Sequence, residues 1–231
     1  MLVASAPHLS WEFWNSVTRL GEAQLLVPTA LALAAWFAMA GERRAATLWL
    51  VLFGLAFGLT TASKIAFIGW GVGVPRLNFT GFSGHAMHSA AVLPLLLRCA
   101  MVGHSRPVQA LAVAAGLIVA AVVATSRVVI GAHSVSESIA GFALGAAASL
   151  LTVALHATPS RPIPHWLLAV LVAAQLLNPL AAPSLGTHGM VTHLALAVSG
   201  HDRPYSRAML RQRGDCWVPD WSATSAGRSC S

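Results

Sequence analysis

Charged side chains are scarce in this sequence. Only 9% of its 231 residues are Asp, Glu, Lys or Arg, and Asp and Glu together number seven. A water-soluble chain of this length cannot cover its surface with so few charges. Hydrophobic residues make up 56% of the chain and the mean hydropathy is +0.69. The composition therefore excludes an ordinary soluble domain and favours an integral membrane protein.

Cysteine is equally rare. Cys99, Cys216 and Cys230 have no Cys-x-x-Cys or Cys/His spacing, which argues against a zinc site and against haem attachment. The sequence therefore predicts no cofactor and no metal. Cys216 and Cys230 either pair, if the tail faces an oxidising compartment, or remain free thiols.

The positive charge of the chain lacks the pattern of a nucleic-acid-binding protein. The formal net charge is +7, but no basic stripe carries interleaved aromatic residues, so nucleic acid is not an expected partner. In a membrane protein, basic residues set the topology or attract anionic membrane lipids. We interpret the charge in that way.

Apolar runs without charge predict the membrane spans. Six such runs lie at 24–40, 45–63, 86–97, 108–125, 139–155 and 166–182. They predict an all-α, polytopic membrane helical bundle of about six transmembrane helices within residues 24–182. Residues 1–23 are expected to form an N-terminal interfacial segment, and residues 183–231 an amphipathic segment and a basic polar tail.

The connections between these spans differ in charge. Basic residues follow the first, third and fifth spans, namely Arg43, Arg44, Arg98, Arg106 and Arg161. By the positive-inside rule these connections lie in the cytoplasm. Residues 61–84 and 126–138 then share the outer face, which for a bacterial inner membrane is the periplasmic face. The side of the membrane that holds the C-terminal tail stays open.

The two outer connections collect the ionisable residues of the central region. Such residues are costly at membrane depth and indicate a functional site. Together the connections hold three cations and one carboxylate, Lys64, Arg76, Arg127 and Glu137, and the histidines nearest them are His85, His88 and His133. An excess of fixed cations beside histidines suits an anion, and above all a phosphoryl group during transfer.

The local order of residues sharpens this prediction. Ser83 and Gly84 precede His85 where a loop enters the third span, so Ser83 is a candidate N-cap and Gly84 lets a ligand approach the backbone. Free amides at such a helix N-terminus bind phosphate. His133 and Glu137 are four residues apart and would share one helix face. A carboxylate on Nδ1 of His133 would leave Nε2 as a nucleophile.

These residues resemble the motifs of the type 2 phosphatidic acid phosphatases (PAP2), which share their core with the vanadium haloperoxidases. The family carries K-x6-RP, PSGH and SR-x5-H-x3-D. Here the second motif reads FSGH at 82–85, and the third runs from Ser126-Arg127 through His133 to Glu137. The first motif is partial, because Lys64 is present but its Arg-Pro positions hold Gly71 and Val72.

The resemblance implies a membrane-bound lipid phosphatase with a helical core. In such an enzyme, His133 attacks phosphorus to form a phosphohistidine, and His85 protonates the leaving group. Glu137 stands in place of the family's aspartate and would orient His133. The mechanism of the family is metal-independent, and the substrate would be a phosphate monoester or diphosphate of a lipid. The residues expected to bind phosphate are Lys64, Ser83, Gly84, Arg127 and, in place of the first-motif arginine, Arg76.

Two alternatives remain at this point. A non-catalytic membrane protein that binds or transports an anion would use the same cations, but it would not need a His-carboxylate pair opposite a second histidine. A haloperoxidase would hold vanadate in the same pocket, but the chain lacks a soluble body. The sequence does not identify the lipid, distinguish a hydrolase from a phosphotransferase, or define the oligomeric state.

Overall fold

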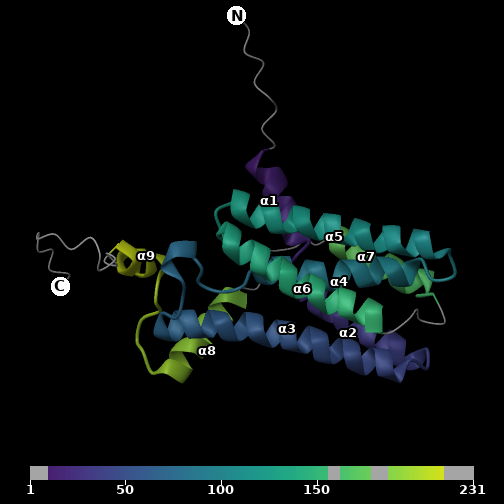
Figure 1. Ribbon diagram of the computed structural model, residues 1–231, viewed down its shortest axis with the longest axis horizontal. Helices are drawn as coiled ribbons and strands as arrows, with labels where there is room; N and C mark the ends of the chain where they lie inside the picture. Colours follow the sequence, from purple (N-terminus) through teal and green to yellow (C-terminus); the bar gives the residue numbers. More distant parts are fainter. Residues whose placement is uncertain (1–9, 156–161, 178–186, 216–231) are drawn as a thin grey trace, which may run out of the picture.

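The computed structural model of the chain describes residues 10–155, 162–177 and 187–215 (Figure 1). Within these ranges the structure is helical, and its one β-bridge joins Val74 to Phe79. The helices are α1 (Trp11–Arg19), α2 (Ala23–Met39), α3 (Arg43–Trp70), η1 (Pro75–Leu77), α4 (Gly84–Ala100), α5 (Arg106–Val129), α6 (Val135–Leu155), α7 (His165–Leu177), α8 (Thr187–Ser199) and α9 (Arg207–Asp215).

Four of the described stretches are long and apolar enough to cross a membrane. They are Trp11–Met39, which joins α1 to α2, and the helices α3, α5 and α6. The predicted fold class, an all-α membrane bundle, is confirmed, and the chain is an integral membrane protein. The count of six spans stays a prediction, because α4 has 17 residues and α7 has 13.

Two helices run further than the charge-free runs predicted. The helix α3 continues past Lys64 and ends where Gly71 adopts the left-handed conformation (φ 67°). The helix α5 includes Arg127 and ends before Gly131 (φ 72°). The sequence placed Lys64 and Arg127 in connections, but neither stretch contains a proline, and each helix continues until a glycine adopts a left-handed conformation. Both cations are therefore held on rigid helix ends.

The helix α4 forms the centre of the bundle. Most of its side chains are buried, and it packs between α5 and α6. Two glycines of α6 permit the close approach: a Cβ added to Gly141 would lie 2.5 Å from the Ser83 carbonyl oxygen, and one added to Gly145 would lie 2.1 Å from that of Met87. These contacts fix α6 against the start of α4, where the predicted site lies.

The two ends of the bundle differ. At one end α3 and α5 finish while α4 and α6 begin, and the Ser83 amide donates to the Glu137 carbonyl at 3.1 Å. The other end carries Arg43, which starts α3, and Arg98 and Arg106, which flank the connection from α4 to α5. The first two of the three cationic connections that the sequence assigned to one side thus share one end of the fold, opposite the candidate site.

The C-terminal segment returns to the end of the bundle that holds the candidate site. There α8 packs along α3, and α9 lies beside η1 (Figure 1). His201 bonds through Nδ1 to the Gly69 carbonyl at 2.7 Å, and the Tyr205 amide donates to the Ile68 carbonyl at 2.9 Å. The tail as far as Asp215 therefore lies on the side of the site. Arg161, Cys216 and Cys230 lie outside the described residues, as does the predicted boundary at residue 182.

Candidate active site

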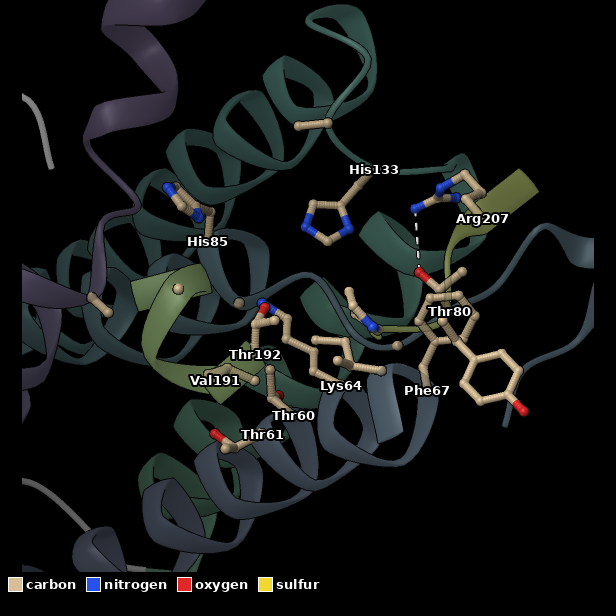
Figure 2. A pocket seen from close by; sticks show the side chains of 18 of the residues that line it. Thr60, Thr61, Lys64, Phe67, Thr80, His85, His133, Val191, Thr192 and Arg207 are labelled. Atoms are coloured by element: carbon tan, nitrogen blue, oxygen red, sulfur yellow. Dashed lines mark hydrogen bonds between the residues drawn. The ribbon is translucent and has the colours of Figure 1, made fainter. Parts of the chain in front are cut away.

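One cavity of about 830 Å³ opens at this end of the bundle. It is lined from α3, α4, α5, α8, the turn before α6 and the start of α9 (Figure 2). No Asp or Glu is among its described lining residues, and no cluster of three metal-ligating side chains occurs in the described part of the chain. Its basic lining residues are the cations Lys64, Arg127 and Arg207 and the histidines His85, His88, His133 and His193. This excess of cations suits an anionic ligand.

His133 occupies the turn before α6, not the helix face that its spacing from Glu137 suggested. Its backbone amide donates to the Arg127 carbonyl at 3.1 Å, which closes the turn at Gly131. The ring nonetheless reaches Glu137, which lies in the first turn of α6: Nδ1 lies 2.8 Å from Oε2. The predicted pair is therefore in contact, although its local geometry differs from the prediction.

Glu137 is fully buried (0% exposed) and surrounded by donors. Oε2 accepts from the Ser134 amide at 3.0 Å, and Oε1 accepts from the Thr80 amide at 2.7 Å. Arg207 donates to both oxygens, at 3.0 and 2.8 Å. A carboxylate can only accept, so His133 carries its proton on Nδ1 and presents Nε2 as the bare nitrogen. This is the tautomer that a histidine nucleophile requires.

The surroundings of His133 keep its ring neutral. Burial lowers its pKa below the ordinary value of 6.5, and the positive charges of Lys64 and Arg127 act in the same direction. The hydrogen bond to Glu137 raises the pKa and offsets part of this effect. The net direction is downward, so the nucleophilic form persists below pH 6.5.

We therefore expect the His133 ring to titrate below pH 6.5 in the folded protein. Its protonation should favour unfolding, because its pKa is lower in the folded than in the unfolded chain, so its contribution to stability is lost as pH falls below 6.5. The measurement is an NMR titration of ring-labelled histidine in detergent, with the signal assigned through His133→Gln. A midpoint at or above pH 6.5 would contradict the expected burial effect.

The start of α4 collects hydrogen-bond donors beside Lys64. Ser83 is the N-cap residue, but its side chain makes no capping bond, and its buried hydroxyl has no partner among the described residues. Gly84 lines the cavity, and a Cβ added there would lie 3.5 Å from Nζ of Lys64. Backbone amides at a helix N-terminus lack intrahelical acceptors. Gly84 and Lys64 are thus brought together at the cavity, whereas Ser83 is fully buried next to them and is not among the lining residues.

Arg127 reaches the same cavity from the last turn of α5. Its Nη1 donates to Thr18 Oγ1 of α1 at 2.8 Å, whereas its buried Nε has no hydrogen-bond partner in the described structure. The predicted interfacial segment therefore contributes to the site, because α1 fixes the guanidinium. The side chains of Lys64, His85 and His133 face the same space in Figure 2.

Arg76 does not join this group. It lies on η1, is exposed, and is not a lining residue of the cavity. The arginine that reaches the cavity instead is Arg207, which the sequence analysis did not select. No local motif marks Arg207, because its contact Glu137 is 70 residues away in the sequence. Thr80 was missed for the same reason, since its partnership with Glu137 spans 57 residues.

The fold and this cavity define an integral membrane protein in which an oriented histidine lies beside cationic side chains that suit an anion. Comparison with known families specifies the class further: residues 67–161 match the model of the PAP2 superfamily, a range that includes the second and third motifs. This match confirms the resemblance to the PAP2 superfamily that the motifs predicted.

A relative and a solved structure were also found. The chain is 38% identical over 208 residues to an uncharacterized 22.5 kDa protein in the cps region of Klebsiella pneumoniae. The alignment covers 87% of this chain and 98% of that protein. The crystal structure of a transmembrane PAP2-type phosphatidylglycerolphosphate phosphatase from Bacillus subtilis aligns with 66% of this chain and 79% of its own, at 24% identity and a TM-score of 0.48.

Proposed function

We propose that the protein is a membrane-bound lipid phosphatase that hydrolyses a phosphate monoester or diphosphate of a lipid through a phosphohistidine, without a metal ion. The observation that carries this proposal is the contact of 2.8 Å between Nδ1 of His133 and the buried Glu137, beside a cavity that Lys64 and Arg127 also line. An anion-binding or transport protein needs the cations, but it does not need an oriented imidazole.

The proposed reaction has two steps. In the first, Nε2 of His133 attacks phosphorus, the bond from phosphorus to the leaving oxygen of the lipid alkoxide or lipid phosphate breaks, and His85 gives that oxygen a proton. In the second, His85 takes a proton from water, the water oxygen attacks phosphorus, and the phosphorus–nitrogen bond breaks. Phosphate leaves and His133 is restored. Lys64, Arg127 and the Ser83-Gly84 turn offset the charge on the phosphoryl oxygens in both steps.

The lipid character of the substrate is supported by the walls of the cavity. Phe57, Phe67 and Ile68 of α3 and Val191 of α8 line it beside the charged groups. Apolar side chains next to cationic ones suit a molecule that carries a phosphate on a hydrocarbon chain. The helix α3 is also long and apolar enough to cross a membrane, which is where such a molecule lies.

We further propose that the site faces the periplasm in a bacterial inner membrane. The support is the location of Arg43, Arg98 and Arg106 at the end of the bundle opposite the cavity, where the positive-inside rule puts the cytoplasm. The exposed residues Met39 and Val129 allow a test. In a cysteine-free background, Val129→Cys should react with an impermeant reagent in intact cells, and Met39→Cys should not; the reverse pattern would refute this orientation.

The test of the activity is phosphate release by detergent-solubilised protein in the presence of a chelator. The panel comprises phosphatidic acid, phosphatidylglycerol phosphate and undecaprenyl diphosphate, with His133→Ala as the control. Release that depends on His133 and survives chelation supports the proposal. Phosphate binding without release from any lipid would favour the anion-binding alternative, and strict dependence on an added metal would refute the metal-independent mechanism.

A separate prediction concerns His85. If it is the proton donor, His85→Ala should slow an alkyl phosphate on the order of 10²- to 10⁴-fold, because an alkoxide is a poor leaving group. The aryl oxide of an aryl phosphate leaves without a proton, so hydrolysis of that ester should be slowed far less. The measurement is the first-step rate of His85→Ala on both substrates, with His193→Ala, another lining residue, as the control. Equal losses on the two esters would remove the acid role.

A further inference from the structure

We infer that Arg207, at the start of α9, is a positioning residue of the active site: it holds the carboxylate of Glu137 in place and acts through it on His133. This inference rests on the proposed phosphatase function. It assigns a catalytic task to the C-terminal segment, which the sequence motifs did not connect with the site.

The contacts of Arg207 carry the inference. Its Nη2 lies 2.8 Å from Oε2 of Glu137, the oxygen that His133 also contacts, and 3.0 Å from Oε1. The same nitrogen donates to Thr80 Oγ1 at 3.3 Å, as Figure 2 shows, and Nη1 donates to the Asn78 carbonyl at 2.9 Å. The guanidinium is thus fixed by four bonds and determines where Glu137 presents its oxygens.

The negative charge of Glu137 gives a second reason to assign this role to Arg207. Glu137 is fully buried, and the neutral His133 leaves its negative charge without compensation. Arg207 is the cation in ion-pair contact with Glu137 among the described residues, and its side chain is 30% exposed at the cavity wall. A buried carboxylate without a cation is costly, so this contact keeps Glu137 in the ionised form that accepts from Nδ1.

Contacts of the C-terminal segment with α3 place Arg207 at the cavity. Leu210, one turn further along α9, is buried in a small apolar cluster with Phe67, Ile68 and Ala195. The backbone bond from Tyr205 to Ile68 fixes the chain just before α9. These contacts anchor both sides of Arg207 to the end of α3. The packing of the C-terminal segment therefore fixes where the guanidinium of Arg207 lies.

The test is a double-mutant cycle on kcat, measured with an activated aryl phosphate so that slow variants remain measurable. Arg207→Gln should lower kcat about 10- to 100-fold in the wild-type background, the scale of a lost bond to a charged group. In a Glu137→Gln background the same change should have little further effect, because Arg207 acts through Glu137. Arg207→Lys, which keeps the charge, should recover part of the loss.

The matched control is Arg211→Gln, an exposed arginine one turn along the same helix, which should retain wild-type kcat. If Arg207→Gln also retains it, or if it loses the same factor in both backgrounds, the inference is wrong. Should Arg207→Gln fail to fold, the cycle is measured with Arg207→Lys. A wild-type protein that releases no phosphate from any substrate refutes the proposed function, whereas an active protein insensitive to Arg207 refutes only the inference.

Discussion

Replacing His133 by alanine should reduce turnover by at least about 10³-fold, because it removes the nucleophile. Without Nε2 there is no atom to accept the phosphoryl group, so the covalent intermediate cannot form. The cationic cavity would remain, so binding of phosphate or vanadate should change far less than turnover. Steady-state rates and vanadate inhibition of wild type and variant measure both quantities.

Trapping the intermediate makes this test specific. Wild-type protein mixed with a lipid labelled in its phosphate and quenched in alkali should retain label as phosphohistidine, and His133→Ala should retain none. Folding is expected to survive, because Glu137 keeps donors from Thr80, Ser134 and Arg207. His193→Ala is the control, since His193 lines the same cavity and has no assigned role. Undiminished label in the His133→Ala protein would require a different nucleophile.

The sequence predicted the membrane class and the approximate places of the long apolar helices, because both follow from the apolar runs, but it did not predict α9. A charge-free run defines the part of a helix in hydrocarbon but not its last turns. For that reason α3 and α5 continue beyond their predicted ends, and Lys64 and Arg127 lie on helices. The pairing of His133 with Glu137 was predicted for a helix face, whereas a turn at Gly131 produces it.

The candidate site was predictable where its residues are neighbours in the sequence. Ser83, Gly84 and His85 form one turn, and their position at the start of α4 follows from that local order. Arg207 and Thr80 reach Glu137 only because the chain folds back over η1, and no spacing in the sequence encodes that contact. Arg76 was selected for its proximity to the expected motif position, but η1 holds it outside the cavity.

Glu137→Gln should lower turnover by roughly 10²- to 10⁴-fold while vanadate still binds. The amide cannot stabilise the imidazolium or enforce the tautomer of His133 as a carboxylate does. Its NH₂ group would also face donors from Thr80, Ser134 or Arg207, whichever way it turns. Some loss of thermal stability should therefore accompany the loss of turnover, because a buried donor would face another donor.

The Glu137→Asp variant tests the charge of the carboxylate separately from the length of the side chain. It keeps the carboxylate and restores the residue of the family motif, so it should be more active than Glu137→Gln. The side chain is one methylene shorter, however, and must still span from α6 to His133 on one side and Arg207 on the other. We expect activity between that of the Gln variant and wild type.

The comparison of the two variants also separates an enzyme from a protein that only binds anions. Removing the negative charge of Glu137 from a cavity lined by Lys64 and Arg127 should leave anion binding unchanged or tighter. A binding protein would therefore gain or keep affinity in Glu137→Gln, and the enzyme would lose turnover at similar affinity. The measurements are kcat and the vanadate inhibition constant for both variants. Wild-type turnover in Glu137→Gln would exclude Glu137 from the mechanism, and with it the main argument that His133 is an oriented nucleophile.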